Sequence, residues 1–253
     1  MHSGSTREAE GSLGQSYRIT IIAWLWRGIR SLFFRRIIMN AIQVNGSWLK
    51  VIAILSMLID HLTYYYGCSN PYVYELMRTV GRIAFPVFAF LLAEGFAHTH
   101  NERRYMASLF TFALISEVPW FLLNHDTTHN VLFTLLAGLL GMHILSSCKQ
   151  KWTAFAFLVA IAFITALAET DYSWYGFGLC MIFFMFRGQP LLQAIFGIPL
   201  MYGYGFPGIL LAFMVIMLYN GERGFIHGRC AKYLCYAFYP CHLMLIYLAK
   251  VIT

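Results

Sequence analysis

Long apolar segments follow one another along most of the chain, and this feature limits the possible folds more than any other. A helix needs about 20 residues to cross the hydrocarbon of a bilayer. The segments are continuously apolar, whereas the strands of a membrane barrel alternate. We therefore expect an all-α, polytopic transmembrane helix bundle with about nine spans, which lie near residues 48–66, 76–97, 104–124, 130–147, 152–169, 172–187, 190–204, 206–220 and 231–251.

The sixth, seventh and eighth segments are shorter than the others. Pro190, Pro207 and the turn Gly203–Tyr204–Gly205 separate them. Two tilted helices with a re-entrant turn would give the same pattern, so the expected count ranges from eight to ten spans.

The balance of apolar and charged residues excludes several other classes of protein. The 253 residues are 59% hydrophobic and 11% charged, whereas a soluble domain has about 45–50% apolar and about 25% charged residues. One soluble core of this size cannot bury so much apolar surface. This excludes a disordered chain, a soluble enzyme and a disulfide-stapled secreted module. The six cysteines form no CxxC pair, so we expect no metal site.

Basic residues fall in every second loop and predict the orientation. The loops near 67–75, 125–129, 170–171 and 204–206 contain no Lys or Arg. Because positive loops stay in the cytoplasm, the N-terminus is expected to be cytoplasmic and the C-terminus outside. The net charge of +7 is then a topology signal and not a nucleic-acid footprint. The basic loop residues are Arg103, Arg104, Lys149, Lys151, Arg187, Arg223, Arg229 and Lys232.

Residues 1–44 differ from the segment 45–253 that carries the spans. Residues 1–18 are polar, and 19–36 mix Trp, Phe and Ile with four Arg. That composition suits a helix in the inner membrane interface, against anionic lipid. Alternatively, Met39 starts the protein and 1–38 is an upstream extension.

Several ionisable residues lie inside the predicted spans. Each costs at least about 2.5–3.5 kcal/mol at mid-bilayer, and such groups usually face the bundle interior and mark function. We expect them to meet in one polar pocket. They are Asp60, His61, Arg78, Arg82, Glu94, His98, Glu117 and His242.

Asp60 and His61 are the candidates for the chemistry. Adjacent residues project about 100° apart on a helix, so His61 is expected to face a substrate while Asp60 binds a partner such as Arg82. A histidine can take a proton from an amine or a hydroxyl. The alternative is that Asp60 and Arg82 form a structural ion pair. Arg78 is expected to extend to the outer interface instead.

The other polar residues have two interpretations each. Arg82 is also a candidate for binding the phosphates of a nucleotide cofactor. Glu94, His98 and Arg104 are further candidates for binding an anionic cofactor, although Arg104 also fits ordinary positive-inside anchoring. Glu117 is either an acid/base group or a ligand for loop amides. Asn130 is expected first of all to be a helix N-cap.

Two residues of the last span complete the candidate set. His242 follows Pro240, which predicts an unwound segment that lines a cavity. His242 is then a second base or an oxyanion ligand, unless it is a core residue. Tyr239 joins Glu117 and Asn130 as a candidate for the substrate pocket.

Several stretches together resemble the TraX family of membrane proteins, which is named for the acetylation of conjugative pilin. The match runs in order from about residue 48 to 250. It comprises LKVIAILSMLIDH at 49–61, GRIAFPVFAFLLAEGFAHT at 81–99, ISEVPW at 115–120, NVLFT at 130–134, DYSWYG at 171–176 and FYPCHL at 238–243.

This resemblance implies a membrane-embedded acetyltransferase in the bacterial cytoplasmic (inner) membrane, with acetyl-CoA as co-substrate. The implied acceptor is the N-terminal amine of a pilin-like protein. An O-acetyltransferase of an envelope glycan or lipid is the alternative within the enzyme class. A transporter or a non-catalytic assembly protein of a conjugation system are alternatives outside it.

Overall fold

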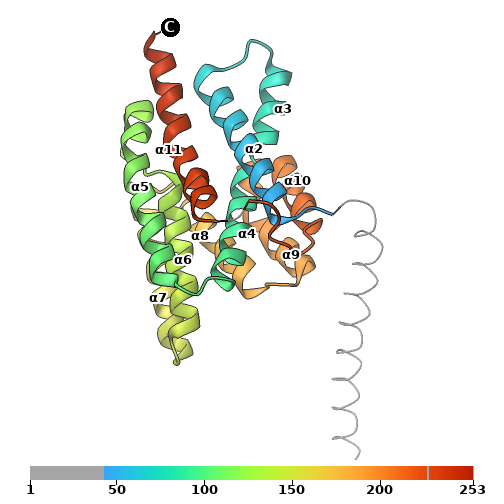
Figure 1. Ribbon diagram of the computed structural model, residues 1–253, viewed down its shortest axis with the longest axis vertical. Helices are drawn as coiled ribbons and strands as arrows, with labels where there is room; N and C mark the ends of the chain where they lie inside the picture. The colour runs from blue at the N-terminus through green and yellow to red at the C-terminus, as the bar shows by residue number, and fades with distance from the viewer. Residues whose placement is uncertain (1–42, 227, 253) are drawn as a thin grey trace, which may run out of the picture. The chain divides into compact units, whose positions relative to one another are not determined.

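The computed structural model describes residues 43–226 and 228–252. The predicted leader and interfacial helix within 1–42 lie outside the described residues. Regular structure in the described part is helical, with two isolated bridges, Val44 to Tyr219 and His129 to Thr170. The helices are α2 (Gly46–Tyr66), α3 (Pro71–Gly81), α4 (Ala84–Ala97), α5 (Glu102–Asn124), α6 (Val131–Ser147), α7 (Lys151–Leu167), α8 (Ser173–Met185), α9 (Pro190–Leu200), η1 (Tyr202–Tyr204), α10 (Phe206–Met217) and α11 (Arg229–Ile252) (Figure 1).

Four helices of the described residues are long and apolar enough to cross a membrane. They are Gly46–Tyr66, Pro71–Ala97, Glu102–Asn124 and Cys230–Ile252. The other apolar helices, α6 to α10, are shorter. The all-helical prediction is confirmed, and each predicted apolar segment contains a helix.

The second predicted segment is not one helix. It divides at Arg82 and Ile83, which lie between α3 and α4. The break precedes Pro86, although a proline inside an apolar segment commonly kinks its helix. Pro86 instead lies in the first turn of α4, where a missing N–H costs no intrahelical hydrogen bond.

Asparagine begins four of the described helices. The side chains of Asn45, Asn70, Asn101 and Asn130 accept hydrogen bonds from amides of the first turns of α2, α3, α5 and α6. An Asn at this position satisfies amides that have no partner within the helix. The N-cap interpretation of Asn130 is confirmed, and its buried side chain also donates to the Ala113 carbonyl at 2.9 Å.

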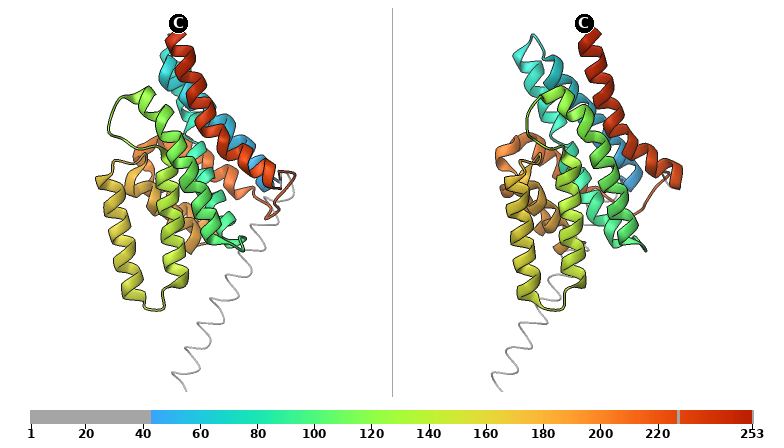
Figure 2. Two further views of the ribbon diagram at one scale, coloured as in Figure 1. Left: turned by 60° about the vertical axis from the view of Figure 1, so that its left-hand side comes forward. Right: turned by 90° about the vertical axis from the view of Figure 1, so that its left-hand side faces the viewer.

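Pro240 does not unwind the last helix. The structure corrects our prediction, because α11 continues from Arg229 to Ile252 with the proline inside it. His242 is buried although α11 is continuous around it. In Figure 2, α11 runs alongside α2 and α5, and the turn of the α6–α7 hairpin lies at the end of the molecule away from the C-terminus.

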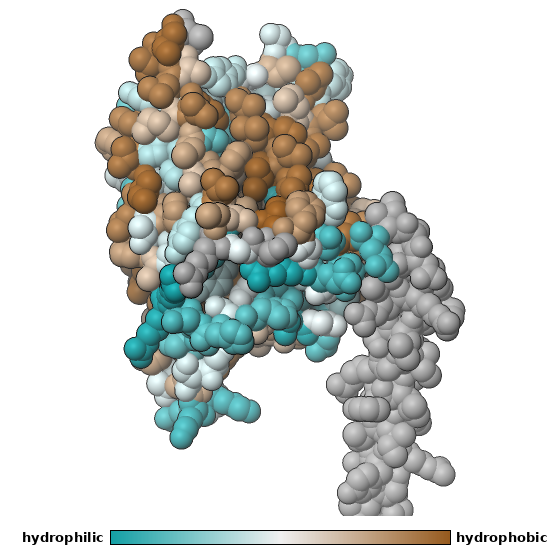
Figure 3. Space-filling view, in the orientation of Figure 1, coloured by the Kyte–Doolittle hydropathy of each residue, from teal (hydrophilic) through white to brown (hydrophobic). Residues whose placement is uncertain are grey.

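The surface divides into an apolar and a polar zone. Hydrophobic residues cover the upper part of the face in Figure 3, and hydrophilic residues gather across its lower part. Large apolar side chains on α7, such as Trp152, Phe155 and Phe163, are more than half exposed. Such a surface fits lipid better than water.

Candidate active site

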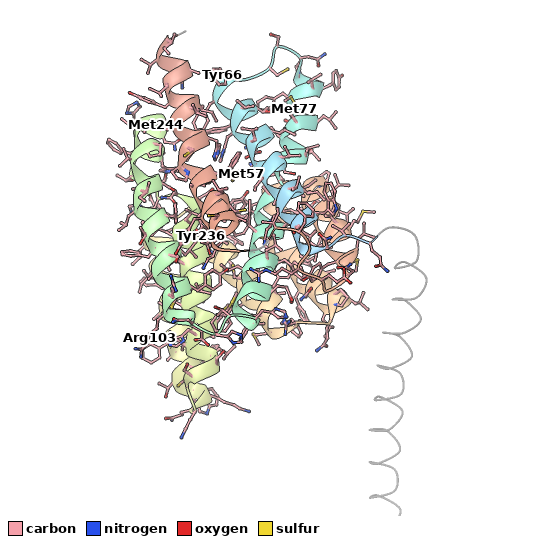
Figure 4. The ribbon with its side chains drawn as sticks, in the orientation of Figure 1. Met57, Tyr66, Met77, Arg103, Tyr236 and Met244 are labelled. Carbon is pink, nitrogen blue, oxygen red and sulfur yellow. The ribbon has the colours of Figure 1, made fainter. Side chains whose placement is uncertain are left out.

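A cavity of about 930 Å³ lies between α2, α4, α5 and α11, and the loop between α7 and α8 closes part of it. Each of the four helices lines it with one regular face. On α2 the lining residues include Lys50, Met57, His61 and Tyr64, which are spaced by seven, four and three residues. This is the spacing of a single helical face. Figure 4 labels Met57 on α2 and Tyr236 on α11, two lining residues from facing helices.

His61 and His242 form the central contact of the site. His61 Nδ1 lies 2.6 Å from His242 Nε2, and the two rings stack with centroids 4.9 Å apart. His242 Nδ1 lies 2.9 Å from the Phe238 carbonyl oxygen, its partner one turn earlier in α11. A carbonyl accepts only, so Nδ1 of His242 must carry a proton and donate it.

This hydrogen-bond chain assigns the tautomer of His61. Two imidazoles this close repel if both are charged. Neutral His242 carries its one proton on Nδ1, so its Nε2 accepts and Nδ1 of His61 donates. The Nε2 of His61 is then left with a free lone pair. His61 lines the cavity, whereas buried His242 lies behind it and is not among the lining residues.

Asp60 pairs with a different arginine from the one expected. Arg78 Nη1 lies 2.8 Å from Asp60 Oδ1, and both side chains are largely buried. Our predictions that Asp60 binds Arg82 and that Arg78 extends to the outer interface are therefore wrong. Gly81 makes this pairing possible, because a Cβ at that position would overlap the Asp60 carboxylate.

Arg82 faces the loop between α7 and α8. Its Nη1 donates to the Tyr172 hydroxyl at 3.4 Å. Gly208 of α10 packs against it so closely that a Cβ there would overlap the Arg82 side chain. Asp171 lies in the same loop, outside the helices, and burial raises its pKa to about 6. More than three helical turns separate Arg82 from Glu94, so one phosphate group does not contact both.

Glu94 and His98 lie together at the other end of α4. Arg187 binds both carboxylate oxygens of Glu94, through Nε at 2.9 Å and Nη2 at 3.2 Å. His98 Nδ1 lies 2.8 Å from the Glu94 carbonyl oxygen. The hydrogen bonds that Arg187 donates to Glu94 raise the pKa of Arg187. The sequence marked Arg187 only as a basic loop residue, and nothing in its neighbours signalled this partner.

A group of cations lines the cavity at the same end as Glu94. Lys50, Arg223 and Lys232 belong to it. The Lys232 ammonium lies 5.2 Å from the ring centroid of Tyr105 and 5.6 Å from that of Tyr236. Sequence reasoning treated Arg223 and Lys232 as topology markers and gave Lys50 no role. The one available signal was that Lys50 and His61 are eleven residues apart, which is about three helical turns and places them on one face.

Besides His242, three predicted site residues lie outside the cavity lining. Glu117 contacts His129 Nδ1 and Asn130 Nδ2, each at 2.5 Å, and so ties α5 to the start of α6. Arg104 is exposed and contacts Tyr233. The cavity therefore brings together Asp60, His61, Arg82, Glu94, His98 and Tyr239, but not Glu117, Asn130 or Arg104.

A family model and a known protein are similar to this chain. The family model described as TraX protein matches residues 45–250. A protein of Dichelobacter nodosus, named as a probable fimbrial assembly protein FimC of serogroup H1, is 29% identical over 238 residues. The match covers 83% of this chain and 97% of that protein. No solved structure matches the chain. The family model covers the whole region that builds the cavity, and the chain therefore belongs to the TraX family.

Proposed function

We propose that this protein is a membrane-embedded acetyltransferase that moves an acetyl group from acetyl-CoA to an acceptor amine. The observation that carries the proposal is one cavity lined both by an imidazole with a free nitrogen and by a cluster of cations, of which Lys50 lies about three turns from His61 on α2. Lys50 and His61 are eleven residues apart, about 16 Å along the axis of α2. That distance suits a long, flexible acyl carrier whose charged end stays at one mouth.

The cationic end is proposed to face the cytoplasm of a bacterium. The basic loop residues lie in every second connection, which favours nine crossings with the N-terminus inside and the C-terminus outside. Tyr66 and Met77 lie at the end of the molecule away from Arg103, as Figure 4 shows. Acetyl-CoA would enter from the cytoplasm of the inner membrane, and the acceptor from the opposite side or from the lipid.

The residues at the cationic end fit the chemistry of acetyl-CoA. Its phosphates are polyanionic, and Lys50, Arg223 and Lys232 supply positive charge. None of these three takes part in an ion pair with a carboxylate within the described part of the chain. The rings of Tyr105 and Tyr236 provide flat surfaces for a base. When bound, acetyl-CoA supplies a thioester carbonyl carbon as the electrophile.

His61 acts as the general base in this proposal. Its Nε2 removes a proton as the acceptor nitrogen forms a bond to the carbonyl carbon. The carbon–sulfur bond breaks, and His61 returns the proton to the leaving thiolate. The products are the N-acetylated acceptor and free CoA thiol, with no oxidant or reductant needed. His242 holds His61 in the required tautomer and does not contact the substrate.

The proposed acceptor is the N-terminal amine of a pilin-like protein. The relative named as a fimbrial assembly protein supports this class of acceptor. A hydroxyl group of an envelope glycan would use the same base and the same bond changes, so the experiment must include both acceptors.

The test is acetyl transfer by purified protein in lipid nanodiscs. Acetyl-CoA is offered with a pilin N-terminal peptide or with an envelope oligosaccharide, and thiol release and acceptor mass are followed. We expect the peptide to gain one acetyl group and the His61→Ala protein to lose about 10²–10⁴-fold in rate. The matched control is His100→Ala, an exposed histidine outside the cavity lining.

Three results would contradict parts of this proposal. If no thiol is released with either acceptor, the proposed acetyltransferase activity is wrong. Acetylation of the oligosaccharide alone removes the pilin-like acceptor. A folded, membrane-inserted His61→Ala protein with the wild-type rate removes the role of His61.

A further inference from the structure

The Tyr239 hydroxyl is a buried polar group without a complete set of partners. The residue is 4% exposed and lines the cavity. Its hydroxyl has no hydrogen-bond partner of normal geometry among the described residues. The Val131 amide approaches the oxygen as a donor, which still leaves the hydroxyl proton without an acceptor. Buried hydroxyls are normally paired, so such an exception requires an explanation.

The position of Tyr239 places this free donor beside the proposed base. The Tyr239 ring lies 6.1 Å from the His61 ring and 5.4 Å from the His242 ring, measured between centroids. Tyr239 and His242 are three residues apart and share one face of α11. The Val131 amide belongs to the first turn of α6, where backbone amides point out of the helix and favour negative charge.

We propose that Tyr239 is a catalytic residue that donates a hydrogen bond to the carbonyl oxygen of the thioester. This rests on the proposed acetyl transfer. When the acceptor attacks, the carbonyl electron pair moves onto that oxygen, and when the carbon–sulfur bond breaks it moves back. The Tyr239 hydroxyl keeps its proton throughout and stabilises the charge while it is present.

A purely structural role predicts a different outcome for the loss of this hydroxyl. The ring of Tyr239 contributes packing, which phenylalanine retains. The hydroxyl proton has no protein acceptor, so its removal breaks no such hydrogen bond within the fold. Tyr66 provides the matched opposite case, because its hydroxyl donates to the Ile246 carbonyl at 3.2 Å and the residue does not line the cavity.

The experiment compares Tyr239→Phe with Tyr66→Phe in the full-length protein in nanodiscs. We expect Tyr239→Phe to lower kcat by about 10²–10³-fold, with KM for acetyl-CoA and the thermal unfolding temperature unchanged. Tyr66→Phe is expected to keep kcat and to lower the unfolding temperature slightly. Isothermal calorimetry with acetyl-CoA gives a binding readout that is independent of turnover.

The outcomes separate this inference from the proposed function. If the wild-type protein transfers acetyl groups and His61→Ala does not, a wild-type kcat for Tyr239→Phe overturns only the role of Tyr239. If Tyr239→Phe lowers both kcat and the thermal unfolding temperature, the residue has a structural role, and its proposed catalytic role is overturned. If the wild-type protein transfers nothing to either acceptor, the proposed function fails, and the role of Tyr239 fails with it.

Discussion

At the scale of single residues, the site depends on which nitrogen of His61 is free. One backbone carbonyl, that of Phe238, decides this through His242. No spacing rule predicts such a chain, because His61 and His242 are 181 residues apart. The sequence nevertheless identified both histidines, since ionisable groups are costly inside apolar helices.

The first prediction at this scale concerns His242 as a positioning residue. His242→Leu removes the acceptor for His61 Nδ1 and should lower kcat by about 10²-fold, with little change in KM. His242→Gln offers an amide oxygen as the acceptor and should recover part of that loss. Steady-state kinetics measure both, and ¹⁵N spectra of His61 report the tautomer. Equal activity of the Leu and Gln variants would argue against positioning.

At the scale of helices, the sequence predicted which segments are helical better than it predicted which side chains of different helices contact each other. Every apolar segment forms a helix, because lipid-exposed backbone must satisfy its own hydrogen bonds. The partner of Asp60 was not predictable, since Arg78 and Arg82 share one helical face by spacing. Contacts from the loop between α7 and α8 and from α10, distant in the sequence, direct Arg82 toward Tyr172 and leave Arg78 for Asp60.

The close approach of α2 and α3 at Gly81 gives the second prediction. Gly81→Ala places a methyl group against the Asp60 carboxylate and should destabilise the fold by about 1–3 kcal/mol. Gly203→Ala is the control, because a Cβ there meets nothing within 4 Å. Thermal unfolding of both variants in the same nanodiscs measures the difference. Equal unfolding temperatures would show that α2 and α3 have room to separate.

At the scale of the whole molecule, one cavity is lined by residues that range from Gly46 near the start of the described chain to Tyr239 in its last helix. Lys50 lines it from α2. Arg223, in the segment before α11, and Lys232, within α11, line the same end. The basic loops predict the orientation, but they did not reveal that two of their residues line the cavity. Position at the cavity wall, which only the fold determines, distinguishes Arg223 and Lys232 from the other basic loop residues.

The third prediction tests the cationic mouth. Lys50→Gln should weaken acetyl-CoA binding by roughly tenfold, about 1.4 kcal/mol, and make the affinity less sensitive to salt. Lys151→Gln, an exposed lysine at the start of α7, should leave binding unchanged. Calorimetry at two ionic strengths measures both variants. Equal affinities for the two would place the phosphates elsewhere.

The short helices α8, α9 and α10 have a consequence for the surrounding membrane. With 13, 11 and 12 residues, they rise only about 16–20 Å, whereas the hydrocarbon layer is about 30 Å thick. Apolar side chains such as Phe196 and Met214 are exposed on them. In the proposed topology of nine crossings, we expect lipid beside these helices to thin, at a cost that grows with acyl-chain length. Bilayer thickness is then expected to affect the side of the protein formed by α8, α9 and α10, and not the side formed by the longer helices.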